Sequence, residues 1–396
     1  MEVFLFFMNL VVSKEVQYIG VDDLTIDLFE SQYPVPEGVS YNSYVILDEK
    51  VAVMDTVDKR GAKQWEENLV AALDGRQVDY LVIHHLEPDH AGSIARLVEL
   101  YPNVTLVGNA KTFAMLPQFF DLPLEGRSLT VKEGDTLSLG KHTLTFVMAP
   151  MVHWPEVMVS YESCEKILFS ADGFGKFGAL CNEKEGDWAC EARRYYFNIV
   201  GKYGAPVQAL LKKAAGLDIA CICPLHGPIL KDNLSYYLDL YQTWSSYEPE
   251  DKGILIAYAS IHGNTAEAAQ KLAEILRSMG EEKVVVSDLA REDMAEVIED
   301  AFRYDRMILA AASYDGGVFP CMESFLHHLK SKAYQNRKVG ILENGSWAPC
   351  AAKTMLSIMD GMKNLTMAET VVTIRSTLKE ADIPQLEKLA GEMRSK

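Results

Sequence analysis

Apolar positions recur in short runs between turns over the first 250 residues, and in a regular strand–helix alternation after them. Tyr41–Leu47 and Val51–Asp55 alternate apolar and polar positions, which predicts a β-hairpin. Tyr80–Ile83 is a short apolar run of the kind that forms a buried strand. The apolar stretch Met1–Val12 is also predicted to be a strand, because it is too short to span a bilayer and has no basic segment before it.

The remaining pattern of this first part predicts further strands and helices joined by turns. The strands are expected over Val104–Gly108, Leu129–Lys132, Thr136–Leu139, His142–Ala149, Glu156–Tyr161, Lys166–Ser170 and Ile219–Pro224. The helices are expected over Gly61–Leu73, Ala91–Leu100, Lys111–Phe120, Cys190–Ala215 and Asn233–Tyr247.

A charged linker with Pro and Gly, Tyr247–Gly253, marks a domain boundary, so we predict domains over residues 1–250 and 254–396. The second domain alternates five strands with five helices, which predicts a doubly wound, five-stranded parallel sheet of flavodoxin size. Its strands are expected over Ile254–Ala259, Lys283–Asp288, Arg306–Ala311, Lys338–Glu343 and Thr366–Thr373. Its helices are expected over Thr265–Met279, Asp293–Tyr304, Met322–Lys330, Ala348–Met359 and Lys379–Ser395.

The net charge of −18 argues against binding to nucleic acid or to an anionic membrane surface, because there is no basic surplus to meet phosphates. Residues 254–396 hold 17 Lys and Arg against 20 Asp and Glu, a net −3, so −15 falls on residues 1–253. Bound cations in the first domain would offset part of that excess. The seven cysteines form no zinc pattern, and no export signal is present, so we expect a cytoplasmic protein.

Ligand-type side chains gather in the loop that follows the strand Tyr80–Ile83. His85, Glu87, Asp89 and His90 lie within six positions, and such a set is a dense group of hard metal ligands. A polar loop that only caps the next helix is the alternative. Three later strand ends each add one more ligand type beside Gly or Pro: His153, Asp172 and His226.

The pattern HxExDH, followed by His, Asp and His at strand ends, resembles the metallo-β-lactamase superfamily over roughly residues 15–250. The resemblance implies an αββα sandwich with a two-metal site at one edge of its sheets. It implies His85, Glu87 and His153 on one metal, Asp89, His90 and His226 on the other, and a bridging Asp172. In some members of the family, the histidine that matches His90 lies off the metal. Glu87 departs from the hydrolase pattern HxHxDH, and this extra carboxylate favours iron or manganese over zinc.

In the second domain, the first strand ends at a loop of hydroxyl, amide and glycine residues directly before a helix. Backbone N–H groups at such a helix start can bind a phosphate. The loop resembles the flavodoxin phosphate loop and matches neither GxGxxG nor the Walker pattern, although a simple capping role is the alternative. Its residues are Ser260, Ile261, His262, Gly263, Asn264 and Thr265.

Two further loops follow the third and fourth strands of this domain. In flavodoxin-like folds these loops hold the isoalloxazine ring, so we expect FMN here, with Trp347 and then Tyr314 as the residues that stack on it. The loops are Ser313, Tyr314, Asp315, Gly316 and Gly317, and Asn344, Gly345, Ser346 and Trp347.

Together the two halves resemble the flavodiiron proteins over nearly the whole chain. This resemblance implies two non-haem irons, FMN, and reduction of O₂ to water, of NO to N₂O, or of both, with no catalytic residue beyond the metal ligands. Two ferrous ions and reduced FMN store four electrons, the number that O₂ requires. It also implies an external electron donor, such as rubredoxin or a flavin reductase, and a head-to-tail homodimer, alone or as a dimer of dimers. The near-neutral second domain is the expected docking face.

Two other functions compete with this interpretation: a hydrolase with a zinc or manganese pair and an accessory flavin domain, and an electron carrier without catalysis. The preference between O₂ and NO should depend on residues near the open face of the irons, of which Trp154, Phe174 and Phe177 are candidates by sequence proximity. His84 is expected to point away from His85, into the core or the surroundings of the metals. His142 follows a turn and is expected to be exposed.

Overall fold

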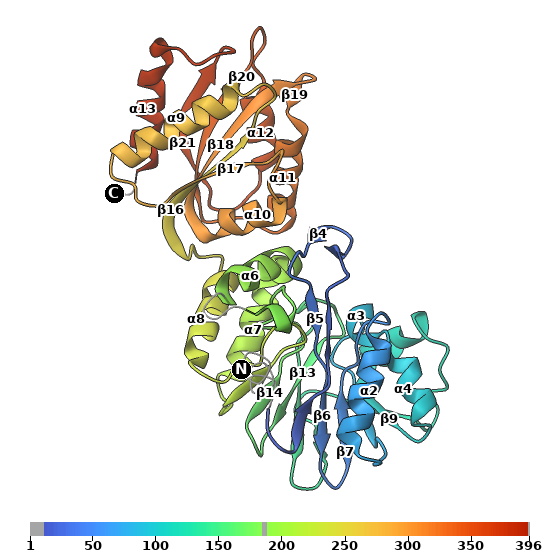
Figure 1. Cartoon of the computed structure of the whole chain (residues 1–396). Coiled ribbons are helices and arrows are strands. Elements are labelled where there is room, and N and C mark those ends of the chain that lie inside the picture. Colours follow the sequence, from blue (N-terminus) through green and yellow to red (C-terminus); the bar gives the residue numbers. More distant parts are fainter. Residues whose placement is uncertain (1–11, 184–187, 395–396) are drawn as a thin grey trace. The chain divides into compact units, whose positions relative to one another are not determined.

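The computed structural model describes residues 12–183 and 188–394, which form two compact units (Figure 1). The first unit comprises residues 1–196 and 205–242, and the second comprises residues 197–204 and 243–396. The two units are described separately below. The strand expected at the start of the chain lies almost wholly outside the described residues. Within the described part of the chain, no helix is long and apolar enough to cross a membrane.

The first sheet of the first unit has the order β1-β6-β7-β8-β9-β10. β6 and β7 pair antiparallel, with Tyr44 opposite Met54, which confirms the predicted hairpin. From β7 to β10 the strands run parallel, because helices connect them on one side. The strands are β1 (Val16–Tyr18), β6 (Tyr44–Leu47), β7 (Val51–Met54), β8 (Tyr80–Val82), β9 (Thr105–Asn109) and β10 (Ser128–Val131). The helices are α2 (Ala62–Leu73), α3 (Pro88–Ala91), α4 (Ile94–Leu100), α5 (Ala110–Met115) and η1 (Leu116–Gln118).

The second sheet follows the order β11-β12-β13-β14-β15, in which only β15 is parallel to its neighbour. Its strands are β11 (Thr136–Ser138), β12 (Thr143–Met148), β13 (Met158–Glu162), β14 (Ile167–Phe169) and β15 (Cys221–Cys223). The helical segments of this half are η2 (Leu180–Asn182), α6 (Trp188–Tyr195), the π-helical turn η3 (Tyr196–Val200), η4 (Gly201–Tyr203), α7 (Gly204–Ala214) and α8 (Leu234–Ser245). Two small hairpins precede β6: β2 (Val21–Asp23) with β5 (Val39–Tyr41), and β3 (Leu28–Phe29) with β4 (Tyr33–Pro34).

The inner faces of the two sheets share one hydrophobic core. Tyr44 and Met54 of the first sheet join Phe146 and Phe169 of the second in a buried cluster, and the rings of Tyr44 and Phe169 lie 5.6 Å apart. Burial of aromatic side chains between facing sheets is the main stabilising term of such sandwiches. Figure 1 shows α2 and α4 beside the first sheet and α7 on the side of the second, in agreement with the expected αββα layers.

The second unit is the expected doubly wound sheet, with the parallel order β17-β16-β18-β20-β21. A short strand, β19, that the sequence pattern did not predict forms a hairpin with the end of β18. The strands are β16 (Asp251–Ala259), β17 (Val284–Asp288), β18 (Tyr304–Tyr314), β19 (Gly317–Val318), β20 (Lys338–Asn344) and β21 (Thr366–Ile374). The helices are α9 (Asn264–Ser278), α10 (Met294–Arg303), α11 (Pro320–Ser331), α12 (Ala351–Met359), η5 (Glu380–Asp382) and α13 (Ile383–Met393).

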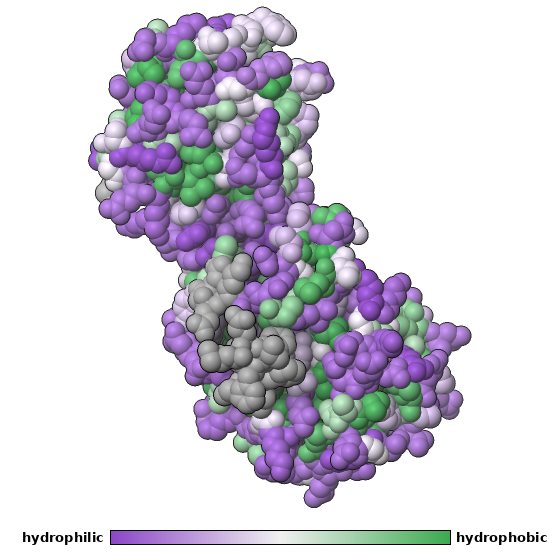
Figure 2. Space-filling model, in the orientation of Figure 1, coloured by the Kyte–Doolittle hydropathy of each residue, from purple (hydrophilic) through white to green (hydrophobic). Residues whose placement is uncertain are grey.

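Residues 197–204 pack with this second unit although they precede the linker. The ring of Phe197 stacks on Phe302 at 4.2 Å, and the Asn198 side chain donates a hydrogen bond to the carbonyl of Ala295. On the face shown in Figure 2, hydrophilic residues predominate on both units, with small hydrophobic groups interspersed. This surface fits the ordinary charged share of the composition.

Candidate functional site

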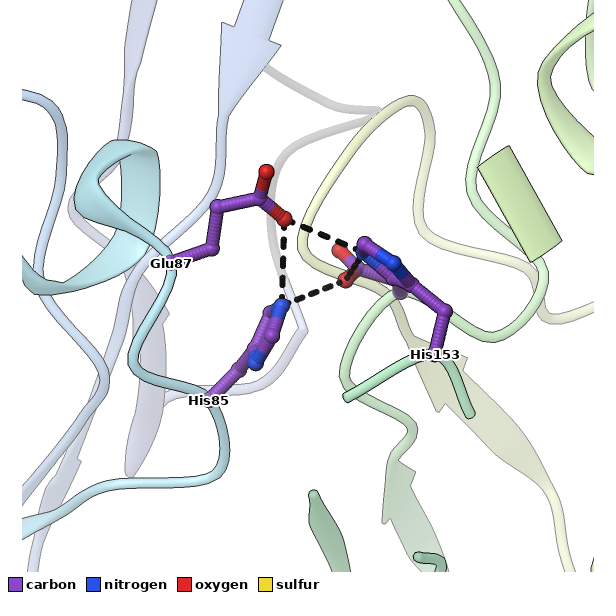
Figure 3. A group of neighbouring side chains, drawn as sticks. His85, Glu87 and His153 are labelled. Atoms are coloured by element: carbon purple, nitrogen blue, oxygen red, sulfur yellow. Dashed lines mark hydrogen bonds and ion pairs between the residues drawn. The ribbon is translucent and has the colours of Figure 1, made fainter. Parts of the chain in front are cut away.

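Three loops of the first unit bring four of the predicted ligands into one group. His85 and Glu87 come from the loop after β8, His153 from the loop after β12, and Asp172 from the loop after β14. Glu87 Oε2 lies 3.2 Å from His85 Nε2 and 3.0 Å from His153 Nε2 (Figure 3). Asp172 Oδ2 closes the group at 3.3 Å from His85 Nε2 and 3.4 Å from His153 Nε2. The carboxylates therefore face the same nitrogen on each imidazole.

The other three predicted ligands form a second group beside the first. Asp89 Oδ2 lies 3.3 Å from His90 Nε2 and 3.2 Å from His226 Nε2, and the two imidazole nitrogens are 3.0 Å apart. Asp172 reaches this group too, because its Oδ1 lies 3.3 Å from His90 Nε2. The structure thus brings all seven residues together, with Asp172 facing both groups.

The buried carboxylates of these groups lack ordinary partners. Both oxygens of Asp89 and both of Asp172 are buried without a hydrogen bond. A buried carboxylate without compensation is very unfavourable, so such a group signals a missing positive charge. Donor separations of 3.0–3.4 Å are those expected around a cation with ligands at about 2.0–2.2 Å. The residues present therefore fit two small, hard cations.

The pKa shifts of the groups have the same origin. Burial alone would lower the pKa of His153, but the carboxylates of Asp172 and Glu87 raise it to about 9. Burial alone would raise the pKa of Asp172, yet His85, His153 and His90 hold it well below its usual range. These carboxylates thus favour positive charge at the imidazoles, which protons or bound cations can supply.

The far nitrogens of two histidines are held by hydrogen bonds. His226 Nδ1 lies 2.7 Å from the carbonyl oxygen of Ser40, and His85 Nδ1 lies 2.8 Å from Glu156 Oε1. In both cases Nε2 is left to face the carboxylates of the site. Glu156 was not anticipated from the sequence. Its place three residues after His153 was the only signal that could have suggested it.

His84 points away from the site, as expected. Its Nδ1 lies 2.5 Å from Asp55 Oδ2 and its Nε2 lies 2.7 Å from Ser160 Oγ, in a buried environment. A further carboxylate that the sequence analysis missed, Glu30, lies beside Glu87. Glu30 is an exposed residue, but partial desolvation and the charge of Glu87 raise its pKa to about 7.

The prediction that His142 is exposed is wrong. His142 is fully buried because its imidazole packs between two carboxylates, with Nδ1 3.2 Å from Glu162 Oε1 and Nε2 3.0 Å from Glu15 Oε2. Its Nε2 faces Glu15, which also accepts from Lys141, while Glu165 accepts from a serine hydroxyl. The carboxylates of this cluster therefore have protein partners, unlike those of Asp89 and Asp172. We interpret the cluster as an ion-pair network.

In the second unit, the three predicted loops line one pocket of about 510 Å³. Trp347 is 89% exposed at its rim, and Tyr314 and Ile261 are also exposed there. Gly263 and Gly317 do not line the pocket, whereas four residues absent from the prediction do. The predicted residues that line it are Ser260, Ile261, His262, Asn264, Thr265, Ser313, Tyr314, Asp315, Gly316, Asn344, Gly345, Ser346 and Trp347, and the added ones are Ala312, Ala348, Cys350 and Ser376.

The local geometry of the loops favours an anion at the start of α9 and connects the loops to one another. Gly263 precedes α9 with a φ of +92°, which favours glycine, and its N–H donates to Ser260 Oγ. Gly263, at the N-cap, offers no side chain to cap α9, and the first helical residues Asn264 and Thr265 line the pocket. The first backbone N–H groups of a helix lack intrahelical partners and can bind an anion. Ser313 Oγ accepts from the backbone of Cys350 and so ties two of the loops together.

Comparisons with known proteins cover both units of the chain. The family described as "ODP family beta lactamase" matches residues 39–227, which include all seven predicted ligands. The anaerobic nitric oxide reductase flavorubredoxin of Pectobacterium atrosepticum is 28% identical over 374 residues, 91% of this chain and 73% of that protein. The rubredoxin oxygen:oxidoreductase of Desulfovibrio gigas is 27% identical with a TM-score of 0.89, covering 97% of each chain. The flavodiiron protein of Giardia intestinalis is 25% identical with a TM-score of 0.91, covering 96% of this chain and 95% of that one.

The chain is similar to flavodiiron proteins along nearly its whole length. The likeness to flavodiiron structures spans both units. The αββα sandwich and the flavodoxin-like sheet predicted from the sequence are confirmed as the two folds of the chain.

Proposed function

We propose that this chain is an oxidoreductase that reduces O₂ to water, NO to N₂O, or both, at two non-haem irons. The observation that carries the proposal is Asp172, whose two buried oxygens lack hydrogen bonds and face one ligand group each. The names of the relatives support both gases, since one is an oxygen oxidoreductase and another a nitric oxide reductase.

We assign one iron to His85, Glu87 and His153 and the other to Asp89, His90 and His226, with Asp172 shared between them. Imidazole and carboxylate ligands with open positions are typical of non-haem iron that handles O₂. Glu87 supports iron over zinc, because its oxygen is a harder donor than the imidazole it replaces. When bound, the irons would supply the gas-binding and redox chemistry, and the protein would hold them and their surroundings in place.

Aromatic side chains border both ligand groups. The ring of Trp154 lies 5.1 Å from His85 and packs against Phe119. On the other side, Phe29 and Tyr195 each lie 5.4 Å from His226. These side chains surround the imidazoles with apolar surface, which suits small uncharged gases better than charged ligands.

The three residues that the sequence suggested for gas preference lie at different distances from the ligands. Trp154 lies against the ligands themselves. Phe177 contacts Tyr195 at 5.1 Å, one layer behind His226. Phe174 stacks on Tyr241 at 4.1 Å and belongs to the surrounding core. We therefore propose Trp154 as the first of the three to influence the preference between O₂ and NO.

We propose FMN as the occupant of the pocket in the second unit. The loop from Ser260 to Thr265 would hold the phosphate at the start of α9, where backbone N–H groups and the helix dipole favour an anion. Tyr314 and Trp347, both exposed at the rim, would pack on the isoalloxazine. When bound, FMN would pass electrons from an external donor towards the irons.

The proposal also covers the domain boundaries, the cellular location, the dimer and the electron donor. We propose an iron domain over residues 1–250, an FMN domain over residues 254–396, a cytoplasmic location, and a head-to-tail homodimer. Rubredoxin or a flavin reductase is the proposed donor, and the exposed Trp347, Tyr314 and Ile261 offer it an apolar contact. The small net charge of residues 254–396 supports docking there, because the first domain would repel an acidic partner.

Metal analysis and anaerobic turnover test the proposed activity. The purified protein should contain two irons and one FMN per chain and should consume O₂ or NO when supplied with chemically reduced rubredoxin. Two zinc ions with hydrolysis and no gas consumption would overturn the proposal in favour of a hydrolase. Electron transfer through the flavin with no gas consumption, unchanged by Asp172→Ala, would instead indicate an electron carrier without a catalytic metal site.

Mixing two inactive variants tests the head-to-tail dimer. Glu87→Ala should disable the irons, and a variant of the phosphate loop such as Thr265→Glu should disable FMN binding. If one chain's FMN serves the partner's irons, refolded mixtures should recover part of the activity. Mixtures without activity, at the molecular mass of a dimer, would contradict transfer between chains.

A further inference from the structure

Glu156 differs from the other groups that surround the predicted ligands because it is a buried anion bonded to one of them. Its side chain and that of His85 are both 0% exposed, and Glu156 Oε1 lies 2.8 Å from His85 Nδ1. Histidines that bind metals commonly donate the far N–H to a carboxylate, which fixes the tautomer and strengthens the ligand. Here that arrangement directs His85 Nε2 towards Glu87 and Asp172.

The protein holds Glu156 firmly in this place. Oε1 also accepts a hydrogen bond from the backbone of Leu86 at 2.9 Å, next to His85 in the chain. The Asn109 side chain donates to the carbonyl oxygen of Glu156 at 2.6 Å, and its own oxygen caps α5. The other carboxylate oxygen, Oε2, is buried without a hydrogen bond. A buried anion held in this way favours positive charge at the His85 end of the site.

Among the described residues, no carboxylate meets the far nitrogen of a histidine in the second ligand group. His226 Nδ1 meets a neutral backbone carbonyl, that of Ser40, and His90 Nδ1 is buried without a hydrogen-bond partner. A neutral acceptor orients an imidazole, but it adds no negative charge. The two ligand groups therefore differ in electrostatic support although their ligand types are similar.

We propose that Glu156 is a positioning residue that makes the group of His85, Glu87, His153 and Asp172 the tighter of the two metal positions. This inference rests on the proposed di-iron function. It adds that the positions are unequal: the His85 group binds metal first, and the group of Asp89, His90 and His226 fills second. Loss of the Glu156 charge should lower the affinity of the first position by about 10- to 100-fold.

The variant Glu156→Gln tests the proposal, because it keeps the shape and a hydrogen-bond acceptor while removing the charge. Glu162→Gln is the matched control, since Glu162 is an equally buried glutamate that faces a histidine, His142, outside the ligand groups. Anaerobic titration of the metal-free protein with Fe²⁺, and with Co²⁺ followed by its absorbance, gives the two affinities. Circular dichroism and FMN content report whether each variant is folded.

Two double variants show which metal position loses affinity when Glu156 is replaced. In Asp89→Asn, which disables the second group, Glu156→Gln should weaken the remaining metal by about 10- to 100-fold. In Glu87→Gln, which disables the first group, it should leave the remaining affinity unchanged. Equal effects in both backgrounds, or no effect in either, would overturn the inference.

The same measurements distinguish this inference from the proposed function. Zinc instead of iron in the wild-type protein would refute the di-iron proposal. The ratio of the Co²⁺ affinities of Glu156→Gln and wild-type protein tests the role of Glu156 by itself. Folded Glu162→Gln should bind both metals as the wild type does. If Glu162→Gln loses as much affinity as Glu156→Gln, the effect is one of general core disturbance and the inference fails.

Discussion

Glu87 and His153 lie 66 residues apart in the chain, yet Glu87 Oε2 approaches His153 Nε2 to 3.0 Å. The contact joins the loop after β8 in one sheet to the loop after β12 in the other. Because these loops belong to different sheets, the metal group depends on the packing of the sandwich. The packed sheets hold the ligands in place and do not depend on them. Substitution of a ligand should therefore reduce metal content while the protein stays folded.

Replacement of Glu87 by histidine should change the metal preference. An imidazole at this position adds nitrogen and removes a hard anionic oxygen, so zinc should gain relative to iron. Protein from cells supplied with both metals should show a higher zinc-to-iron ratio by mass spectrometry, with FMN unchanged. Asp218→His, at an exposed carboxylate outside the ligand groups, is the control and should keep the wild-type ratio.

Asp172→Asn should empty both metal positions, because Asp172 is the one carboxylate that faces both groups. Iron content should fall and gas reduction should drop by about 100-fold or more, beyond the usual effect of a residue that only supports a ligand. Asp218→Asn, at an exposed ion pair with Lys166, should leave both unchanged. Retention of one full equivalent of iron would contradict the shared role of Asp172.

Gly345→Ala should weaken FMN binding without loss of iron. A Cβ at Gly345 would lie 2.8 Å from the Cα of Pro349 and 3.1 Å from Ser313 Oγ, so the loops that line the pocket would have to shift. Flavin released on dilution, followed by fluorescence, should increase about 10-fold or more, which corresponds to about 1.4 kcal/mol.

A second glycine of the same unit provides the control for that change. Gly391 lies in α13, and a Cβ there would meet no atom within 4 Å. Gly391→Ala should therefore leave FMN affinity unchanged and raise the free energy of unfolding by about 0.5–1 kcal/mol. Loss of FMN from Gly391→Ala would show that the pocket responds to any change in this unit.

Asp251 should make stability depend on pH in the acid range. Burial alone would raise its pKa, but hydrogen bonds from Lys283 at 2.7 Å and Arg303 at 2.9 Å lower it. A lowered folded-state pKa means that the contribution is present above pH of about 4 and is lost as the pH falls through the folded-state value. Since the side chain is partly exposed, its contribution should be about 0.5 kcal/mol.

Denaturant unfolding of Asp251→Asn at several pH values measures this contribution. The variant should be less stable than the wild type at pH 7, and the difference should shrink below a pH of about 4. A difference in the free energy of unfolding that grows as the pH falls would contradict a lowered pKa of Asp251. Asp305 also borders this region, so Asp305→Asn should be measured beside it.

Much of the fold could be predicted because periodicity is a local property of the sequence. The strand–helix alternation of the second unit identified five parallel strands, although β16 begins three residues early, at Asp251, inside the predicted linker. The hairpin of β18 and β19 was missed, since a two-residue strand has no period to detect. Residues 197–204 were assigned to a long helix, and their packing on Phe302 depends on a contact distant in sequence.

The sequence by itself determined the types of chemistry: imidazoles and carboxylates at strand ends, a carboxylate at position 87, and a phosphate-type loop before α9. These are read from neighbouring residues, because a strand end and a helix start are encoded locally. Only the tertiary structure decided that Asp172 faces both groups, that Glu156 meets His85 across 71 residues, and that His142 is buried. Such contacts arise when two sheets pack face to face, so their partners are set by the whole core and by no local pattern.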